Sequence, residues 1–130
     1  MKRMHRELPR PTEGELELLR ILWQRGAATV RELHEEVTRT RPLGYTGVLK
    51  LLQIMTEKGL VEREESGKAH VYCAVASKRA TQDQLLRDMS RRLFAGSAAQ
   101  LAMHALSLEP VNDREFEELR ILLDRKRQRP

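Results

Sequence analysis

Side chains that can bind nucleic acid recur at helical spacing in residues 46–57. Threonine and glutamine can bond a base edge or a phosphate, and lysine can reach the acceptors of guanine or a phosphate oxygen. Intervals of three and four residues place such side chains on one face of a helix, with the apolar residues of this stretch on the opposite face. The presented face consists of Thr46, Leu49, Lys50, Gln53 and Glu57, and the packed face of Val48, Leu52 and Met55. The stretch is therefore predicted to be a helix that reads DNA, in which the leucine of the presented face can touch a thymine methyl group.

Residues close to this helix start add candidate DNA contacts. Between residues 39 and 63, five basic side chains, Arg41 among them, outnumber two acidic ones, so the local charge is +3. Gly47 lets the start of the helix approach the sugar-phosphate backbone closely. Tyr45 can stack on or bond a phosphate, and it can equally pack against the preceding helix, so both interpretations stay open. The alternative for the whole face is an ordinary solvated helix surface.

The sequence argues against a metal site and against catalysis. His70 and Cys73 invite a metal interpretation, but residues three apart on a strand point to opposite faces. Cys73 is the only cysteine, which excludes an internal disulfide and suits a reducing compartment. No serine or cysteine nucleophile has a histidine at a recognisable spacing, and there is no glycine-rich phosphate loop. We expect no metal, no cofactor and no enzymatic activity.

Local signals predict the elements that must position the reading helix. Four helix starts are marked by a capping side chain with Glu or Gln three residues later. These pairs are Thr12 with Glu15, Thr29 with Glu32, Ser97 with Gln100, and Asn112 with Glu115. Apolar spacing predicts helices over residues 13–24, 30–38 and 46–58, followed by a β-hairpin of residues 60–64 and 69–75. On the hairpin, Lys68 and His70 can touch phosphates across the minor groove, although Glu64 and Glu65 oppose this.

Three helices followed by a hairpin is the order of a winged helix-turn-helix, in which the third helix enters the major groove. Three further helices follow Ser77, and their apolar stripes have too little chain to form a stable core alone, so they imply a second copy as partner. The predicted dimerisation residues are Leu86, Met89, Leu93, Phe94, Leu101, Ala105, Leu108, Phe116, Leu119, Leu122 and Leu123. The expected fold is mainly α with a small β-hairpin: a winged-helix DNA-binding domain plus a C-terminal helical dimerisation domain.

The domain boundaries follow from these elements and from the charge distribution. We expect a basic N-terminal tail in residues 1–11, the winged helix in 12–76, the dimerisation domain in 77–124 and a basic C-terminal tail in 125–130. Residues 1–10 and 124–130 each carry a charge of +3 out of a total of +5, so residues 11–123 sum to −1. No long apolar run marks a membrane span or a signal peptide, and we expect a cytoplasmic protein.

The sequence resembles the penicillinase repressors of the BlaI/MecI type. The matching stretches are ELLRILWQRGAATVRELHEEV near the start, YTGVLKLLQIMTEKGLVERE from Tyr45, GKAHVYCAV from Gly67 and RLFAGSAAQLAMHAL from Arg92. Together they cover nearly everything from residue 12 to 123. The resemblance implies a homodimeric transcriptional repressor on a palindromic operator, controlling β-lactam-response or related genes and thus antibiotic resistance.

This chain departs from the family pattern at several positions. Relatives commonly show Tyr-Thr-Thr-Val where Gly47 stands here, which implies a different base preference. Many relatives have Arg-Leu where this chain has Ile54 and Met55, which removes a possible phosphate contact. The resemblance also implies release from DNA by a membrane-sensor-activated protease that cuts near His104 and Ala105, where relatives that are cut show Asn-Phe. One cysteine cannot supply the cysteine-rich motif of the copper-responsive branch.

A function of another class competes with repression. Winged helices also serve as protein-interaction modules, because a fold does not determine a function. In this alternative the basic tails contact an acidic partner. The two hypotheses differ in whether the presented face of residues 46–57 binds DNA.

Overall fold

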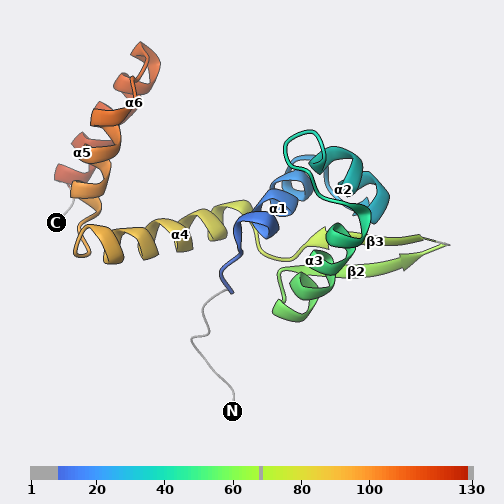
Figure 1. The fold of residues 1–130 in the computed structure, drawn as a ribbon. Coiled ribbons are helices and arrows are strands. Elements are labelled where there is room, and N and C mark those ends of the chain that lie inside the picture. Colours follow the sequence, from blue (N-terminus) through green and yellow to red (C-terminus); the bar gives the residue numbers. More distant parts are fainter. Residues whose placement is uncertain (1–8, 68, 129–130) are drawn as a thin grey trace. The chain divides into compact units, whose positions relative to one another are not determined.

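The computed structural model describes residues 9–67 and 69–128, with the side chain of Ser66 left out (Figure 1). The described elements are α1 (Glu13–Arg25), β1 (Ala28–Thr29), α2 (Val30–Val37), α3 (Tyr45–Lys58), β2 (Val61–Ser66), β3 (Ala69–Ala74), α4 (Lys78–Leu93), α5 (Ala98–Leu108) and α6 (Asp113–Gln128). The predicted fold class, mainly helical with a small antiparallel sheet, is confirmed. The basic tail residues before Pro9 and after Gln128 lie outside the described residues, as does Lys68.

The helix starts are those that the capping pairs predicted. The backbone N–H of Glu15 donates to Thr12 Oγ1 at 3.3 Å, and the Thr12 N–H donates back to the Glu15 carboxylate at 2.9 Å. A second capping box opens α2, where the Thr29 backbone N–H binds the Glu32 carboxylate and lowers the pKa of that carboxyl. α3 differs, because its N-cap is Gly44 without a side-chain bond, and the helix begins one residue earlier than predicted.

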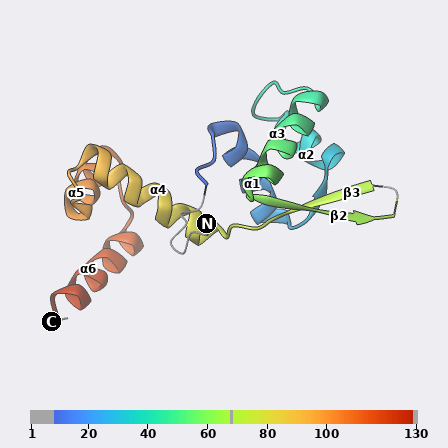
Figure 2. The same ribbon diagram turned by 90° about the horizontal axis from the view of Figure 1, so that it is seen from below.

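The sheet has three strands, in the order β1-β3-β2, so the prediction of a hairpin alone was incomplete. β1 is only two residues long and pairs with the edge of β3, Ala28 opposite Tyr72. A strand of two residues has no periodicity of its own and exists through the partner it pairs with, which explains why the sequence pattern missed it. β2 and β3 extend beyond the three helices as a narrow two-stranded ribbon (Figure 2).

One core holds α1, α2, α3 and the sheet together. Its largest fully buried apolar side chains are Leu18, Leu19, Leu33, Leu52, Met55 and Leu60. A charged group also lies inside: the Glu15 side chain is 2% exposed, and its Oε1 lies 2.7 Å from Lys58 Nζ. The same ammonium donates to the carbonyl of Arg10 at 3.2 Å. The end of α3 is thereby tied to the start of α1.

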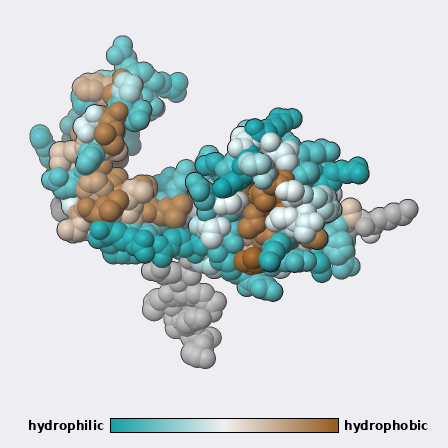
Figure 3. Space-filling model, viewed as in Figure 1, coloured by the Kyte–Doolittle hydropathy of each residue, from teal (hydrophilic) through white to brown (hydrophobic). Residues whose placement is uncertain are grey.

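The chain divides into two compact units, the first ending at Leu86 and the second beginning at Arg87. α4 runs across this boundary. In the second unit Phe94 and His104 form an edge-to-face ring contact with centroids 5.7 Å apart, but no residue of α5 or α6 is buried. Figure 3 shows hydrophobic residues on the surface of these helices. The predicted domain boundaries and the dimerisation residues stay predictions.

Candidate nucleic-acid interface

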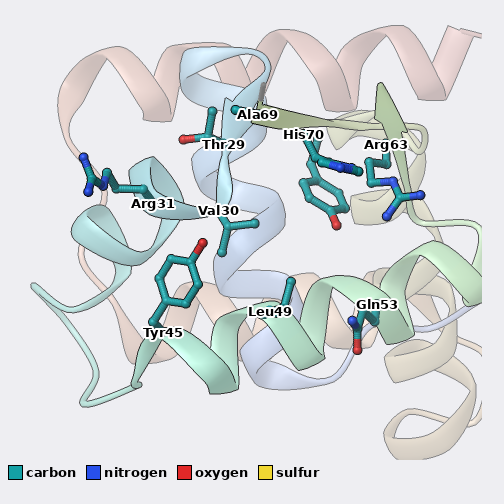
Figure 4. A pocket seen from close by; sticks show the side chains of 10 residues that line it. Thr29, Val30, Arg31, Tyr45, Leu49, Gln53, Arg63, Ala69 and His70 are labelled. Carbon is teal, nitrogen blue, oxygen red and sulfur yellow. The ribbon is translucent and has the colours of Figure 1, made fainter. Parts of the chain in front are cut away.

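A groove of about 630 Å³ lies between α3, the start of α2 and the sheet (Figure 4). Tyr45, Leu49 and Gln53 line it from α3 at intervals of four residues. Leu49 and Gln53 belong to the predicted presented face, whereas its other members, Thr46, Lys50 and Glu57, do not line this groove. His70 lines it from β3. The structure thus brings four of the predicted DNA-contacting residues together around one hollow.

The structure shows one of the two interpretations of Tyr45, its packing against the preceding helix, while its contact with a phosphate stays a prediction. Its ring lies 5.9 Å from the His34 ring of α2 in an edge-to-face arrangement, so it packs against the preceding helix. The residue nevertheless stays 49% exposed and lines the groove, where Figure 4 shows its ring rising from α3 toward Val30. A ligand in the groove can reach the tyrosine without displacing it from α2.

The other presented residues of α3 differ in how much of them is accessible. Thr46, Lys50 and Gln53 are exposed, whereas Leu49 is half-buried and packs against the core. No carboxylate of residues 9–67 and 69–128 lies within ion-pair distance of Lys50. Its ammonium is thus available for an anion, while Leu49 offers only one side to a thymine methyl group.

Two predicted contacts are placed differently from the expectation. A Cβ on Gly47 would lie 2.8 Å from Leu43 Cδ2. The side of this glycine that lacks a side chain therefore faces Leu43 and not the sugar-phosphate backbone of a bound DNA. Arg41 does not line the groove. Its Nη2 lies 3.9 Å from Glu13 Oε1 at the start of α1. The reason is that residues 38–44 fold back toward α1, where Thr40 also bonds Glu17 at 3.0 Å.

β2 and β3 form the hairpin that is the wing of the fold. Their register determines which wing residues face the groove. Arg63 pairs with Tyr72 and Glu65 pairs with His70, so these four share one face of the sheet. Glu62 and Glu64 lie on the other face beside Cys73. Burial and the two carboxylates, Glu64 more than Glu62, raise the pKa of the Cys73 thiol. Glu62 and Glu64 therefore lie on the face away from the groove, whereas Glu65 shares the face of His70 and Arg63.

The same register separates His70 from Cys73. His70 shares the face of Tyr72, and Cys73 pairs with Glu62 on the opposite face. The two side chains cannot bind one ion, as the strand periodicity predicted. Among the described residues there is no group of three histidine, cysteine or carboxylate side chains that could hold a metal, and no helix long and apolar enough to cross a membrane.

Two arginines that the sequence did not single out as DNA contacts also line the groove. Arg31 comes from the first turn of α2 and Arg63 from β2, and both are exposed. Within the described part of the chain, neither has a carboxylate in ion-pair distance. Charge alternation could have indicated Arg63, which stands between Glu62 and Glu64 on β2. For Arg31 the only available signal was its place near a capped helix start, where backbone N–H groups favour anions.

Comparison with known proteins places this geometry in a family. The family model of the penicillinase repressor matches residues 11–125, which is most of the chain. The chain belongs to the penicillinase repressor family. A methicillin resistance regulatory protein, MecI of Mammaliicoccus sciuri, is 21% identical over 88% of this chain and 94% of its own length.

Solved structures show the fold of this penicillinase repressor family member. The DNA-binding domain of the repressor BlaI matches with a TM-score of 0.52 and 18% identity, over 58% of this chain and 93% of that one. The monomeric form of Bacillus licheniformis BlaI in complex with the blaP half-operator matches with a TM-score of 0.51 and 19% identity, over 57% and 90%. The predicted winged helix is confirmed by these likenesses.

The family departure at residues 54 and 55 takes a concrete form in the structure. Met55 is fully buried in the core, whereas Ile54 is 37% exposed. The position at which the resemblance implied an arginine is therefore on the surface and carries an aliphatic side chain here. This position therefore offers no cation, whereas Lys50, Arg31 and Arg63 are exposed cations elsewhere in the first unit.

Proposed function

We propose that this protein is a transcriptional repressor that binds operator DNA through the groove along α3. The observation that supports it most is a set of exposed cations in a member of the penicillinase repressor family: Arg31 and Arg63 line the groove, and Lys50 lies on the presented face of α3. In a winged helix the third helix enters the major groove and the hairpin follows the phosphate backbone. Lys50 and Gln53 are then directed at base edges, and Arg31 and Arg63 flank them at the level of the phosphates.

We propose further that the protein binds as a homodimer, one half-site to each copy. The similar BlaI structure holds a half-operator on a monomeric form, which fits one DNA-binding unit to one half-site. In this chain the second unit offers the surface for the partner copy. Its exposed apolar side chains include Leu93, Met103, Leu106, Leu108, Phe116, Leu122 and Leu123. Isolated helices that leave so many apolar groups in water favour a second copy that covers them.

Binding should be strongly salt-dependent, because each phosphate contact by lysine or arginine releases a counterion. Genomic fragments bound by the protein are selected first, and the dissociation constant for the recovered palindrome is measured between 50 and 200 mM salt. With about six or more phosphate contacts per dimer, affinity should fall roughly 1,000-fold over that range. A protein-interaction module would recover no consensus, and its weak DNA binding would not discriminate between fragments.

Lys50 and Arg63 should respond differently to removal of their charge. Lys50→Ala should weaken binding by about 1–3 kcal/mol per half-site and relax the preference at one base position, if the ammonium reads guanine. Arg63→Ala should weaken all sequences alike and lower the salt slope by about one per half-site. Arg39→Ala is the matched control, since its guanidinium pairs with Glu36 on the surface at 3.7 Å and does not line the groove. Uniform weakening by Lys50→Ala would assign that lysine to a phosphate.

The regulated genes and the release step follow from the resemblance alone. We propose β-lactam-response or related genes as targets, and cleavage near His104 and Ala105 as the release step. Both residues are exposed in the middle of α5, and a protease that binds extended backbone must open that helix first. The intact mass of the protein from cells exposed to a β-lactam measures this directly, and uncut protein during full induction would exclude cleavage.

A further inference from the structure

The junction between the wing and α4 is held at three consecutive residues. The Val75 backbone N–H donates to the carbonyl of Leu60 at 2.9 Å. The Trp23 indole N–H donates to the carbonyl of Ala76 at 2.9 Å, across 53 residues of sequence. Ser77 then caps α4 by accepting from the Ala80 N–H at 3.0 Å. Each residue from Val75 to Ser77 is therefore held by a hydrogen bond before α4 begins.

Side chains just before α4 and in its first turn are also buried within the first unit. Ala76 is 6% exposed and Thr81 is 2% exposed, although neither is a large apolar residue. Trp23 itself packs against the core that positions α3. The first unit contains Trp23, Ala76 and Thr81. The helix α4, which begins in this unit, continues past Leu86 into the second. The direction of α4 at its start is therefore coupled to the core of the unit that carries the groove.

We propose that Trp23 is a positioning residue that fixes the direction in which α4 leaves the DNA-binding unit, and thereby sets the spacing between half-sites that the dimer accepts. The inference rests on the proposed function, because it presumes a dimer on a palindrome. A dimer gains affinity for two half-sites only when both units can engage together, and a fixed exit raises the effective concentration at one spacing and lowers it at others. A loose exit tolerates several spacings but favours none.

The test compares full-length Trp23→Phe with the unaltered protein on three DNA probes. They are the recovered palindrome, a single half-site, and the palindrome with about two base pairs inserted at its centre, which rotates one half-site out of register. Phenylalanine keeps an aromatic ring but has no N–H for the Ala76 carbonyl. We expect unchanged half-site affinity, about tenfold weaker binding to the palindrome, and a several-fold smaller difference between the palindrome and the inserted probe.

Two further variants separate positioning from general destabilisation. Thr12→Ala removes the N-cap of α1 but leaves the junction intact, so it should preserve the discrimination between spacings. Ala76→Gly keeps the indole and makes the backbone that it holds more flexible. It should therefore reduce the difference between the palindrome and the inserted probe, as Trp23→Phe does. If Trp23→Phe fails to fold, Ala76→Gly provides the test. Equal weakening on all probes, or unchanged spacing preference in the folded variants, would overturn the inference. Absence of a palindrome preference in the unaltered protein would instead refute the proposed function.

Discussion

Phe116→Glu is expected to convert the protein from a dimer into a monomer with its helices intact. Phe116 is 60% exposed on α6 of a single copy, in company with exposed Leu122 and Leu123 further along the helix. A glutamate in the centre of an apolar contact must be buried without a partner, which costs several kcal/mol. A loss of about 3–4 kcal/mol corresponds to a roughly 100- to 1,000-fold weaker dimer. Affinity for the palindrome should fall with it, and half-site affinity should not.

Sedimentation of the full chain across a concentration series measures this effect. Gln100→Glu is the matched control, because it adds the same charge to α5 at an exposed position on the polar stripe that also carries His104 and Ser107. Leu101 and Leu119 are less suitable sites for the charge, since they are half-buried already in one copy and their loss would damage the protomer. A Phe116→Glu protein that still sediments as a dimer would remove α6 from the interface.

The elements that the sequence predicted correctly depend on local signals. A capping box involves residues three apart, and the two boxes at Thr12 and Thr29 are present in the structure as predicted. The stripe of Val48, Leu52 and Met55 is buried because its period matches that of a helix. Such features need no knowledge of what lies opposite in space.

The features that were missed depend on partners far away in the chain. β1 exists because Ala28 meets Tyr72, a residue 44 positions later. Arg31 and Arg63 become neighbours of the presented face only through the crossing of α2 over α3 and the register of β2 with β3. Conversely, Arg41 lies close to α3 in sequence but is drawn to Glu13 by the return of residues 38–44. Proximity in sequence therefore predicted α3 and its buried stripe, whereas the cations that line the groove beside it depend on tertiary contacts.

Breaking the ion pair between Glu15 and Lys58 on one side is expected to destabilise the first unit strongly. Its carboxylate is 2% exposed and accepts from Lys58 Nζ at 2.7 Å and from the Thr12 N–H at 2.9 Å. Lys58→Met would leave a buried carboxylate without its cation, which costs about 3–5 kcal/mol in comparable cases. Because the lysine is 29% exposed, water can compensate in part, and a loss of about 3 kcal/mol is the expected result.

The measurement is thermal unfolding followed by the fluorescence of Trp23, the only tryptophan, which packs against the core of the first unit. A loss of about 3 kcal/mol should lower Tm by roughly 10–20 °C for a unit of this size. Arg20→Met breaks the surface pair with Glu17, which is 2.9 Å long, and should change stability by less than about 1 kcal/mol. The double variant Glu15→Gln with Lys58→Met removes both charges, while the glutamine oxygen can still accept from the Thr12 N–H. It should recover more than half of the loss, since the cost lies in the unpaired charge and not in the missing contact. If Lys58→Met is as mild as Arg20→Met, the carboxylate is solvated, and the link from the end of α3 to the start of α1 contributes little to holding the reading helix in place.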